Sequence, residues 1–180
     1  NQRVLELDSF QPEFTRPIWQ YLDSAVSDTR IETGQRLRAE KAADLARIEA
    51  AYGVEREIVL AIWGLESAYG FNYGGIPVIE SLATLAYEGR RRRFGEEQLM
   101  AALRILENGD ITTARMVGSW AGAMGHTQFI PRSFEAYAVD FTGDGRRDLW
   151  AEDALDALAS TANYLARFGW QTGEIGRAHV

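Results

Sequence analysis

Apolar residues recur at steps of three and four along most of the chain, and this spacing predicts a series of short helices. We predict helices over residues 17–27, 36–51, 54–69, 78–87, 95–107, 133–139 and 152–168, with a further short one beginning at 111–115. Gly53 is expected to end the second of these as a C-terminal glycine. The alternation typical of strands never persists beyond about four residues. The chain is therefore expected to be all-α.

Three segments lack a clear helical spacing. The N-terminal residues Val4, Leu5 and Leu7 suggest an extended start. The sequence FNYGGIPV after Gly70 has the composition of a turn-rich link. Residues 118–131 are rich in glycine and other small residues, so we expect a loop or a broken helix there.

Glu66 occupies a position that the helical spacing assigns to an apolar residue. It shares one predicted helix face with Val59, Ile62, Trp63 and Tyr69. A carboxylate that faces inward among Trp63, Leu65 and Tyr69 is costly to ionise, so we expect a raised pKa and a proton still held near neutral pH. These are the properties of a general acid. The alternative is a carboxylate at the mouth of the core that pairs with an arginine.

The charge balance limits the classes of partner. The 180-residue chain has a formal net charge of −7 and a pI near 4.9, which disfavours nucleic acid because such binding needs a basic surface. The exception is local, a run of arginines from Arg90 to Arg93. Such a run is either a solvated helix face or a site for an anionic ligand.

Cysteine and histidine usage excludes further classes of site. The sequence contains no cysteine, which excludes disulfides, thiolate metal sites and cysteine catalysis. It contains two histidines without His-Glu-x-x-His spacing, so a catalytic zinc site is not expected. No apolar run approaches the roughly 18 residues that a transmembrane helix requires.

The chain ends suggest a piece of a longer protein. It begins with Asn1 rather than methionine, and residues 175–180, IGRAHV, match one translation of a sequencing-adapter tail. We therefore expect a non-native tail at 175–180 and a single catalytic domain over residues 1–174, truncated on its C-terminal side. No repeat, low-complexity segment or linker divides that range.

Five motifs together resemble the membrane-bound lytic murein transglycosylase B family. They are GLESAYG (64–70), SLATLAY (81–87), GSWAGAMGHTQFIPRSF (118–134), AVDFTGDGRRDLW (138–150) and ANY (162–164). The resemblance covers roughly residues 4–174 and implies a lysozyme-like helical globule with a catalytic cleft. It also implies cleavage of the MurNAc–GlcNAc β-1,4 bond of peptidoglycan, with formation of 1,6-anhydro-MurNAc and without a cofactor.

The resemblance assigns Glu66 as a single acid and then base. Glycosidases commonly use two carboxylates about 5–9.5 Å apart, but substrate assistance is a recognised exception. Glu80 and Glu88 are candidates for a second carboxylate, although both are more typical of surface charges. A hydrolytic muramidase, a non-catalytic peptidoglycan-binding module and a calcium-dependent structural protein stay open as alternatives.

The resemblance also implies roles for residues of the glycine-rich segment. Ser119 would hydrogen-bond the carboxyl of Glu66, whereas the remaining residues would line the sugar cleft: Met124, Gly125, Gln128 and Tyr164. Small residues there would let the backbone approach a sugar closely. His126 contacts either ligand or solvent, and a lone histidine is usually structural. The aromatic residues either stack on sugars or pack in the core: Trp63, Tyr69, Tyr73 and Trp120.

The sequence from Asp140 to Gly145 has the first half of a calcium loop. Asp140, Thr142 and Asp144 stand at positions one, three and five, glycine at six and Arg146 at position seven. Position twelve is alanine, so the loop is not a standard EF-hand. The resemblance assigns Asp156 as the closing ligand, with Asp153 as the alternative. We expect a calcium or sodium ion that braces the loop.

The expected partner is the peptidoglycan glycan strand, whose stem-peptide carboxylates suit the basic arginine run. Cell-wall cleavage implies a periplasmic location, with a possible membrane tether outside this chain. We expect a monomer.

Overall fold

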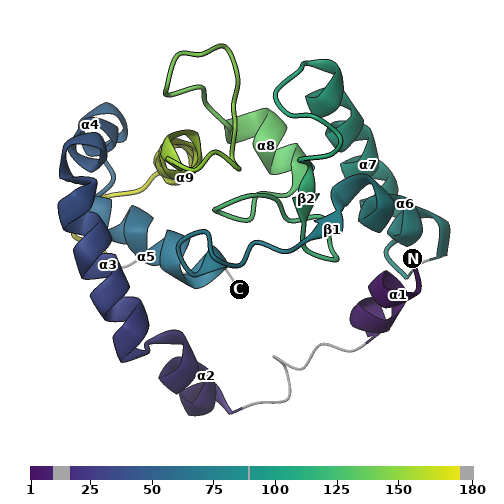
Figure 1. Ribbon diagram of the computed structural model, residues 1–180, viewed down its shortest axis with the longest axis horizontal. Coiled ribbons are helices and arrows are strands. Elements are labelled where there is room, and N and C mark those ends of the chain that lie inside the picture. Colours follow the sequence, from purple (N-terminus) through teal and green to yellow (C-terminus); the bar gives the residue numbers. More distant parts are fainter. Residues whose placement is uncertain (10–16, 89, 175–180) are drawn as a thin grey trace.

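Helices make up nearly all the regular structure of the computed structural model, which describes residues 1–9, 17–88 and 90–174 (Figure 1). The helices are α1 (Gln2–Ser9), α2 (Ile18–Ala25), α3 (Asp28–Glu40), α4 (Ala42–Tyr52), α5 (Arg56–Ser67), α6 (Val78–Glu88), α7 (Arg92–Glu107), α8 (Pro131–Tyr137) and α9 (Leu155–Arg167). Two short strands, β1 (Ile76–Pro77) and β2 (Val117–Gly118), pair antiparallel. The predicted all-α class is confirmed. In the described ranges, no helix combines the length and apolar character needed to cross a membrane.

Three predictions of local structure are wrong. The start is helix α1 rather than extended, because Val4 and Asp8, one turn apart, are both buried and the helix packs against α6. The predicted helix 36–51 is divided at Lys41 (φ −103°, ψ 19°), where α3 ends and α4 begins. Residues 111–115 form turns instead of a helix. Gly53 does end α4, in the left-handed conformation (φ 68°).

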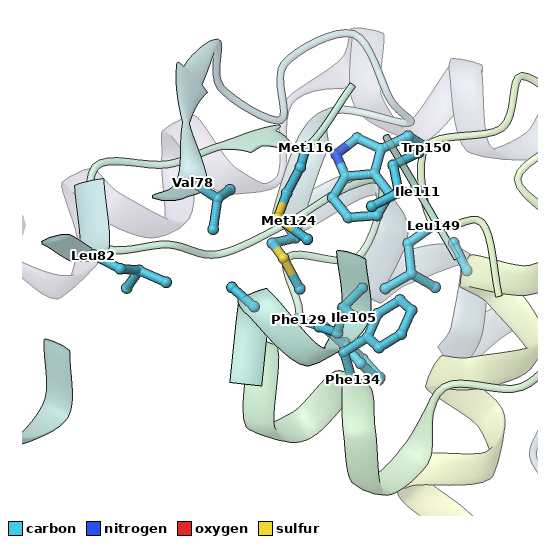
Figure 2. Packing of buried hydrophobic residues seen from close by; sticks show 12 residues of the cluster. Val78, Leu82, Ile105, Ile111, Met116, Met124, Phe129, Phe134, Leu149 and Trp150 are labelled. Atoms are coloured by element: carbon cyan, nitrogen blue, oxygen red, sulfur yellow. The ribbon is translucent and has the colours of Figure 1, made fainter. Parts of the chain in front are cut away.

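Two clusters of buried side chains lie on either side of α9. The first packs α6, α7 and α8 against the segment 116–129, with Met116 and Met124 at its centre (Figure 2). The second packs α4 and α5 against α9 around Trp63. Helix α9 contributes to both, since Ala157 lies in the first cluster and Leu158 in the second. Segments far apart in sequence therefore meet along α9.

Candidate active site

Glu66 lies in the last turn of α5 and lines a cavity of about 320 Å³. One side of the cavity, here the helical wall, comes from α5 and α9: Ile62, Glu66, Thr161, Tyr164 and Leu165. The other, here the loop wall, comes from the segment before α8: Thr127, Gln128, Phe129 and Ile130. Ser133 of α8 completes the lining. The cavity thus joins parts of the chain that lie about a hundred residues apart, from Ile62 to Leu165.

The prediction that Glu66 faces the core is wrong in detail. The buried stripe of α5 runs through Val59, Leu60, Trp63, Gly64 and Ser67. Glu66 lies beside this stripe, is exposed and lines the cavity, whereas Leu65 is 50% exposed and does not line it. On a helix of 3.6 residues per turn these buried residues centre near Trp63 and Ser67, so Val59 and Glu66 both lie at the edge of the buried face.

The electrostatic expectation for Glu66 nevertheless agrees with the structure. Partial burial by the cavity walls raises the pKa of its carboxyl above the ordinary value of 4.5. Within the described residues, no hydrogen bond or ion pair engages the carboxyl, so the alternative of an arginine partner is not found. A carboxyl of this kind retains its proton to higher pH and remains free to give it to a ligand.

The side chain of Gln128, on the loop wall, is fixed by hydrogen bonds to two backbone carbonyls. Its backbone has φ +54°, a left-handed conformation that is uncommon for a residue with a side chain. Its side-chain amide donates to the carbonyl of Tyr73 at 3.1 Å and to that of Gly125 at 2.9 Å. These two bonds fix the side chain at the cavity.

Tyr164 presents an aromatic surface on the helical wall. Its ring packs against Phe129 of the loop wall, with ring centroids 5.8 Å apart. On its other sides it contacts Tyr137 and Phe168, at 5.0 and 4.6 Å between centroids. Phe129 and Tyr164 of this cluster thus join the two walls and give the cavity of Glu66 an apolar surface.

Three of the predicted cleft residues do not lie at the cavity. The Ser119 hydroxyl accepts from the amides of Ala121 and Ala123, and no hydrogen bond joins it to Glu66 in the described part of the chain. Met124 is fully buried in the first core cluster (Figure 2). Gly125 has φ +65°, and a Cβ there would lie 2.4 Å from the Leu149 carbonyl oxygen. Its close approach is therefore to protein backbone.

Several cavity residues were absent from the sequence prediction: Ile62, Thr127, Phe129, Ile130, Ser133, Thr161 and Leu165. Thr161 stands three residues before Tyr164 on α9, so helical spacing could have identified it. Thr127 and Phe129 flank Gln128, but a loop has no periodicity from which to infer their direction. Glu80 and Glu88 lie outside this cavity, so it provides no second carboxylate.

His126 and the predicted aromatic residues mostly pack. His126 is 6% exposed and its Nδ1 accepts from the indole nitrogen of Trp63, which is 3% exposed. The Tyr69 hydroxyl donates to the Arg30 carbonyl at 3.0 Å. The Tyr73 ring lies 5.5 Å from the His126 ring. None of these four residues lines the cavity of Glu66.

The arginine run divides into two pairs. Arg90 and Arg91 approach the buried carboxylate of Asp8 at 3.7 and 3.4 Å, and the Arg91 guanidinium lies 5.4 Å from the ring centroid of Trp120. Arg92 and Arg93 form exposed pairs with Glu96 and Glu97, one helical turn away. The second pair is the solvated face that such a run commonly forms.

Three carboxylates gather at the candidate metal loop. Among the described residues, Asp140, Asp144 and Asp156 have oxygens within 4.8 Å of one another. Asp156 is buried, and its two oxygens accept from the amides of Phe141, Thr142 and Asp148. Asp153, the alternative ligand, instead accepts from the amide of Leu155 at the start of α9.

The remaining loop positions turn inward around Asp140. Its carboxylate accepts from the Thr142 hydroxyl at 3.3 Å and from the amides of Gly143, Asp144 and Gly145. The amide of Arg146 donates to Asp144 at 2.9 Å. Burial, with a contribution from Asp140, raises the pKa of the Asp156 carboxyl. A bound cation would offset this, and an all-oxygen set suits calcium.

The comparisons with known proteins agree with this geometry. A family model described as "Transglycosylase SLT domain" matches residues 1–180. Membrane-bound lytic murein transglycosylase B of Escherichia coli K12 is 39% identical over 131 residues, or 72% of this chain and 36% of that protein. These residues span most of the described fold.

Solved structures of lytic transglycosylases are also similar to this chain. SltB3 of Pseudomonas aeruginosa, in complex with NAG-anhNAM-pentapeptide, is 54% identical with a TM-score of 0.93 over 97% of this chain and 46% of that one. E. coli lytic transglycosylase Slt35, in complex with calcium, is 33% identical with a TM-score of 0.87, over 97% and 55%. The chain spans less than two thirds of each of these relatives. Because the family model matches from the first residue to the last, the chain belongs to the transglycosylase SLT domain family.

Proposed function

We propose that the chain carries the catalytic centre of a lytic murein transglycosylase with Glu66 as its single acid and base. The observation that carries this proposal is the carboxyl of Glu66, raised in pKa, unpaired within the described residues, and placed in a cavity without a second carboxylate. The ligands of SltB3, NAG-anhNAM-pentapeptide and NAG-NAM-pentapeptide, support peptidoglycan as the substrate and an anhydro sugar as the product.

The reaction needs no water. Glu66 gives its proton to the glycosidic oxygen between MurNAc and GlcNAc, and that bond breaks while the N-acetyl group of MurNAc stabilises the developing positive charge. The ionised Glu66 then takes the proton of the C6 hydroxyl, whose oxygen bonds to C1 and closes the 1,6-anhydro ring. Glu66 ends the cycle protonated, so the proton balance closes.

The cavity residues have complementary roles in this proposal. The Gln128 amide, fixed by two carbonyls, leaves its oxygen side to meet sugar hydroxyls or the N-acetyl group. Tyr164 and Phe129 offer apolar rings to a sugar face. Met124, Gly125 and Ser119 act from behind the loop wall and support its shape.

Replacement of the carboxyl tests the proposal directly. In Glu66→Gln we expect the rate of peptidoglycan cleavage to fall by about 10²–10⁴-fold, the usual contribution of a general acid. The variant should still fold, with a melting temperature close to that of the wild type. The matched control is Glu88→Gln, which replaces an exposed glutamate on α6 that lies outside the cavity of Glu66. It should cleave at the wild-type rate.

The products separate the alternatives. Mass spectrometry of wild-type digests should show anhydro-MurNAc ends, which lack one water relative to hydrolysed ends. Hydrolysed ends would identify a muramidase with the same glutamate. Binding of glycan strands with no turnover by either protein would identify a non-catalytic module.

We also propose a calcium ion in the loop from Asp140 to Asp156. Asp140, Asp144 and Asp156 would hold it with their carboxylates, with Thr142 and Arg146 at the third and seventh loop positions. The calcium complex of Slt35 supports this assignment. The ion would brace the loop and take no part in the bond cleavage. Because peptidoglycan is the proposed substrate, we also propose the periplasm as the site of action.

A further inference from the structure

His126 lies directly behind the loop wall. Its Nδ1 accepts a hydrogen bond from Nε1 of Trp63 at 3.1 Å, and both side chains are buried. An indole nitrogen can only donate, so Nδ1 must be unprotonated and the imidazole is neutral, with its proton on Nε2. The geometry therefore fixes both the charge and the tautomer of His126.

The backbone of His126 is tied to the same helix. The Ser67 hydroxyl donates to the His126 carbonyl at 2.5 Å and accepts from the Gly70 amide at 2.9 Å. Gly70 has φ +89°, and a Cβ there would lie 2.3 Å from the imidazole, so the ring is closely enclosed. Side chain and backbone of one residue are thus both anchored to the end of α5.

These anchors flank the proposed acid. Trp63 stands three residues before Glu66 on α5 and Ser67 directly after it, whereas Thr127, Gln128 and Phe129 directly follow His126. The hydrogen bonds of Trp63 and Ser67 to His126 therefore join the end of α5 that carries Glu66 to the loop wall opposite. A change in the ring would shift the two walls relative to each other.

We propose that His126 is a positioning residue for the reaction, because its neutral imidazole holds the loop wall in register with Glu66. The inference rests on the function proposed above and extends it to a residue outside the cavity. It makes the geometry of the site sensitive to one proton that is not the catalytic proton.

Protonation would break this arrangement. An imidazolium would point an N–H at Nδ1 toward the N–H of Trp63, which leaves two buried donors without an acceptor. Burial lowers the pKa of His126 below 6.5, and Lys41 acts in the same direction. The Ala151 backbone, Asp148 and Asp153 act in the opposite direction, and the Tyr73 ring packs against the imidazole. Stability from the neutral ring is therefore complete above pH 6.5 and decreases as pH falls toward the lower folded-state pKa.

Imidazole ¹⁵N NMR tests the charge state directly. The sequence has two histidines, so a His179→Gln variant assigns the signals of His126. We expect His126 to remain in the Nε2–H tautomer as the pH falls below 6.5, because burial lowers its pKa. Titration of His126 at or above 6.5, or an Nδ1–H tautomer, would overturn the proposal whether or not the chain is an enzyme.

Paired substitutions test the positioning role. His126→Phe removes the acceptor, and we expect kcat to fall about 10- to 100-fold with KM little changed, as for a displaced catalytic group. His126→Asn restores an uncharged acceptor near Nδ1, so it should recover part of this loss. We expect kcat of the wild type to decline as the pH falls below 6.5 and the imidazole gains a proton, and His126→Asn should not show this decline.

The outcomes remain distinct from those of the proposed function. If wild type forms anhydro products while His126→Phe and His126→Asn match its kcat and pH profile, the positioning role is wrong and the function stands. If His126→Phe does not fold, His126→Asn and the NMR titration decide. If wild type forms no anhydro product, the function fails, and with it the positioning role, even where the NMR result is as expected.

Discussion

The two walls of the cavity are built on different principles. On the helical wall, Glu66 and Tyr164 project from regular helices, and their directions follow from position along α5 and α9. On the loop wall, directions depend on single backbone conformations, such as φ +65° at Gly125 and +54° at Gln128. On the helical wall, substitution of one side chain leaves the direction of its neighbours unchanged, because the helix backbone sets them. On the loop wall, a change in one backbone dihedral angle changes the direction of the side chains that follow.

The walls also differ in what holds them. The helices of the helical wall, α5 and α9, carry the second core cluster around Trp63 and Leu158, whereas Tyr164 itself packs against the first cluster. The loop wall depends on layers beneath it, since Met124 is buried in the first cluster and the His126 amide donates to the Leu149 carbonyl. Left-handed backbone at Gln128 costs about 1–2 kcal/mol, which its two side-chain hydrogen bonds offset. The loop wall is therefore the part more easily lost.

Gly125→Ala should have the largest effect on stability. The left-handed backbone costs about 1–2 kcal/mol for a residue with Cβ. The new methyl would also lie 2.4 Å from the Leu149 carbonyl oxygen, and overpacking costs about a further 1–3 kcal/mol. Urea unfolding should show the sum, and peptidoglycan cleavage should fall with it because Gln128 would move.

Gly53→Ala is the matched control for this substitution. Gly53 has φ +68° at the end of α4, and a Cβ there would meet nothing within 4 Å. It carries the same backbone strain without the contact, so only about 1–2 kcal/mol should be lost and cleavage should be retained. Equal losses at the two glycines would show that the loop wall is not tightly packed.

Calcium should stabilise the loop wall more than the helical wall. Asp156 accepts from the Asp148 amide, and the adjacent Leu149 packs under Gly125 and His126. At a calcium concentration near 100 Kd the gain is about 2.7 kcal/mol, which should raise the melting temperature by several degrees. Hydrogen exchange should slow more over residues 124–130 than over α5.

Substitution of the ligands checks this effect. Asp156→Asn should remove the calcium response, whereas Asp153→Asn should keep it, because Asp153 lies outside the carboxylate cluster and accepts from the Leu155 amide at the start of α9. If Asp153→Asn loses the calcium response and Asp156→Asn keeps it, Asp153 rather than Asp156 is the closing ligand. If calcium slows hydrogen exchange equally over residues 124–130 and over α5, the proposed stabilisation of the loop wall by the calcium loop is contradicted.

The helical wall was largely predictable from the sequence. Helical spacing indicated α5, and the family motifs identified Glu66 and Tyr164, both of which line the cavity. The error in the orientation of Glu66 came from treating 59, 62, 63 and 66 as one buried face. The buried residues instead centre near Trp63 and Ser67, and the Ser67 hydroxyl donates to the His126 carbonyl. That contact joins residues 59 positions apart, which no local pattern contains.

The loop wall was predictable only in part. The motif indicated Gln128, but Met124 and Gly125 turn away from the cavity, and Ser119 satisfies amides of its own turn. In a loop, side-chain direction follows from tertiary contacts such as the one with Leu149. For the same reason the helical start was missed, since α1 is fixed by burial of Val4 against α6 rather than by its own spacing. Residues 175–180 lie outside the described residues.

The smallest expected effect is the contribution of Glu66 ionisation to the stability of the folded protein. Because its pKa is raised in the folded state, ionisation of Glu66 disfavours folding at pH values above that pKa and has no effect below about 4.5, where the carboxyl is protonated in both states. Glutamine is uncharged throughout. Glu66→Gln should therefore melt at the wild-type temperature in acid and slightly above it near neutral pH, with a small difference because the residue is partly open to solvent. A lower melting temperature for Glu66→Gln near neutral pH would show that the folded protein favours the ionised carboxylate of Glu66. The pKa of this carboxyl would then not be raised, and Glu66 would not retain a proton for catalysis.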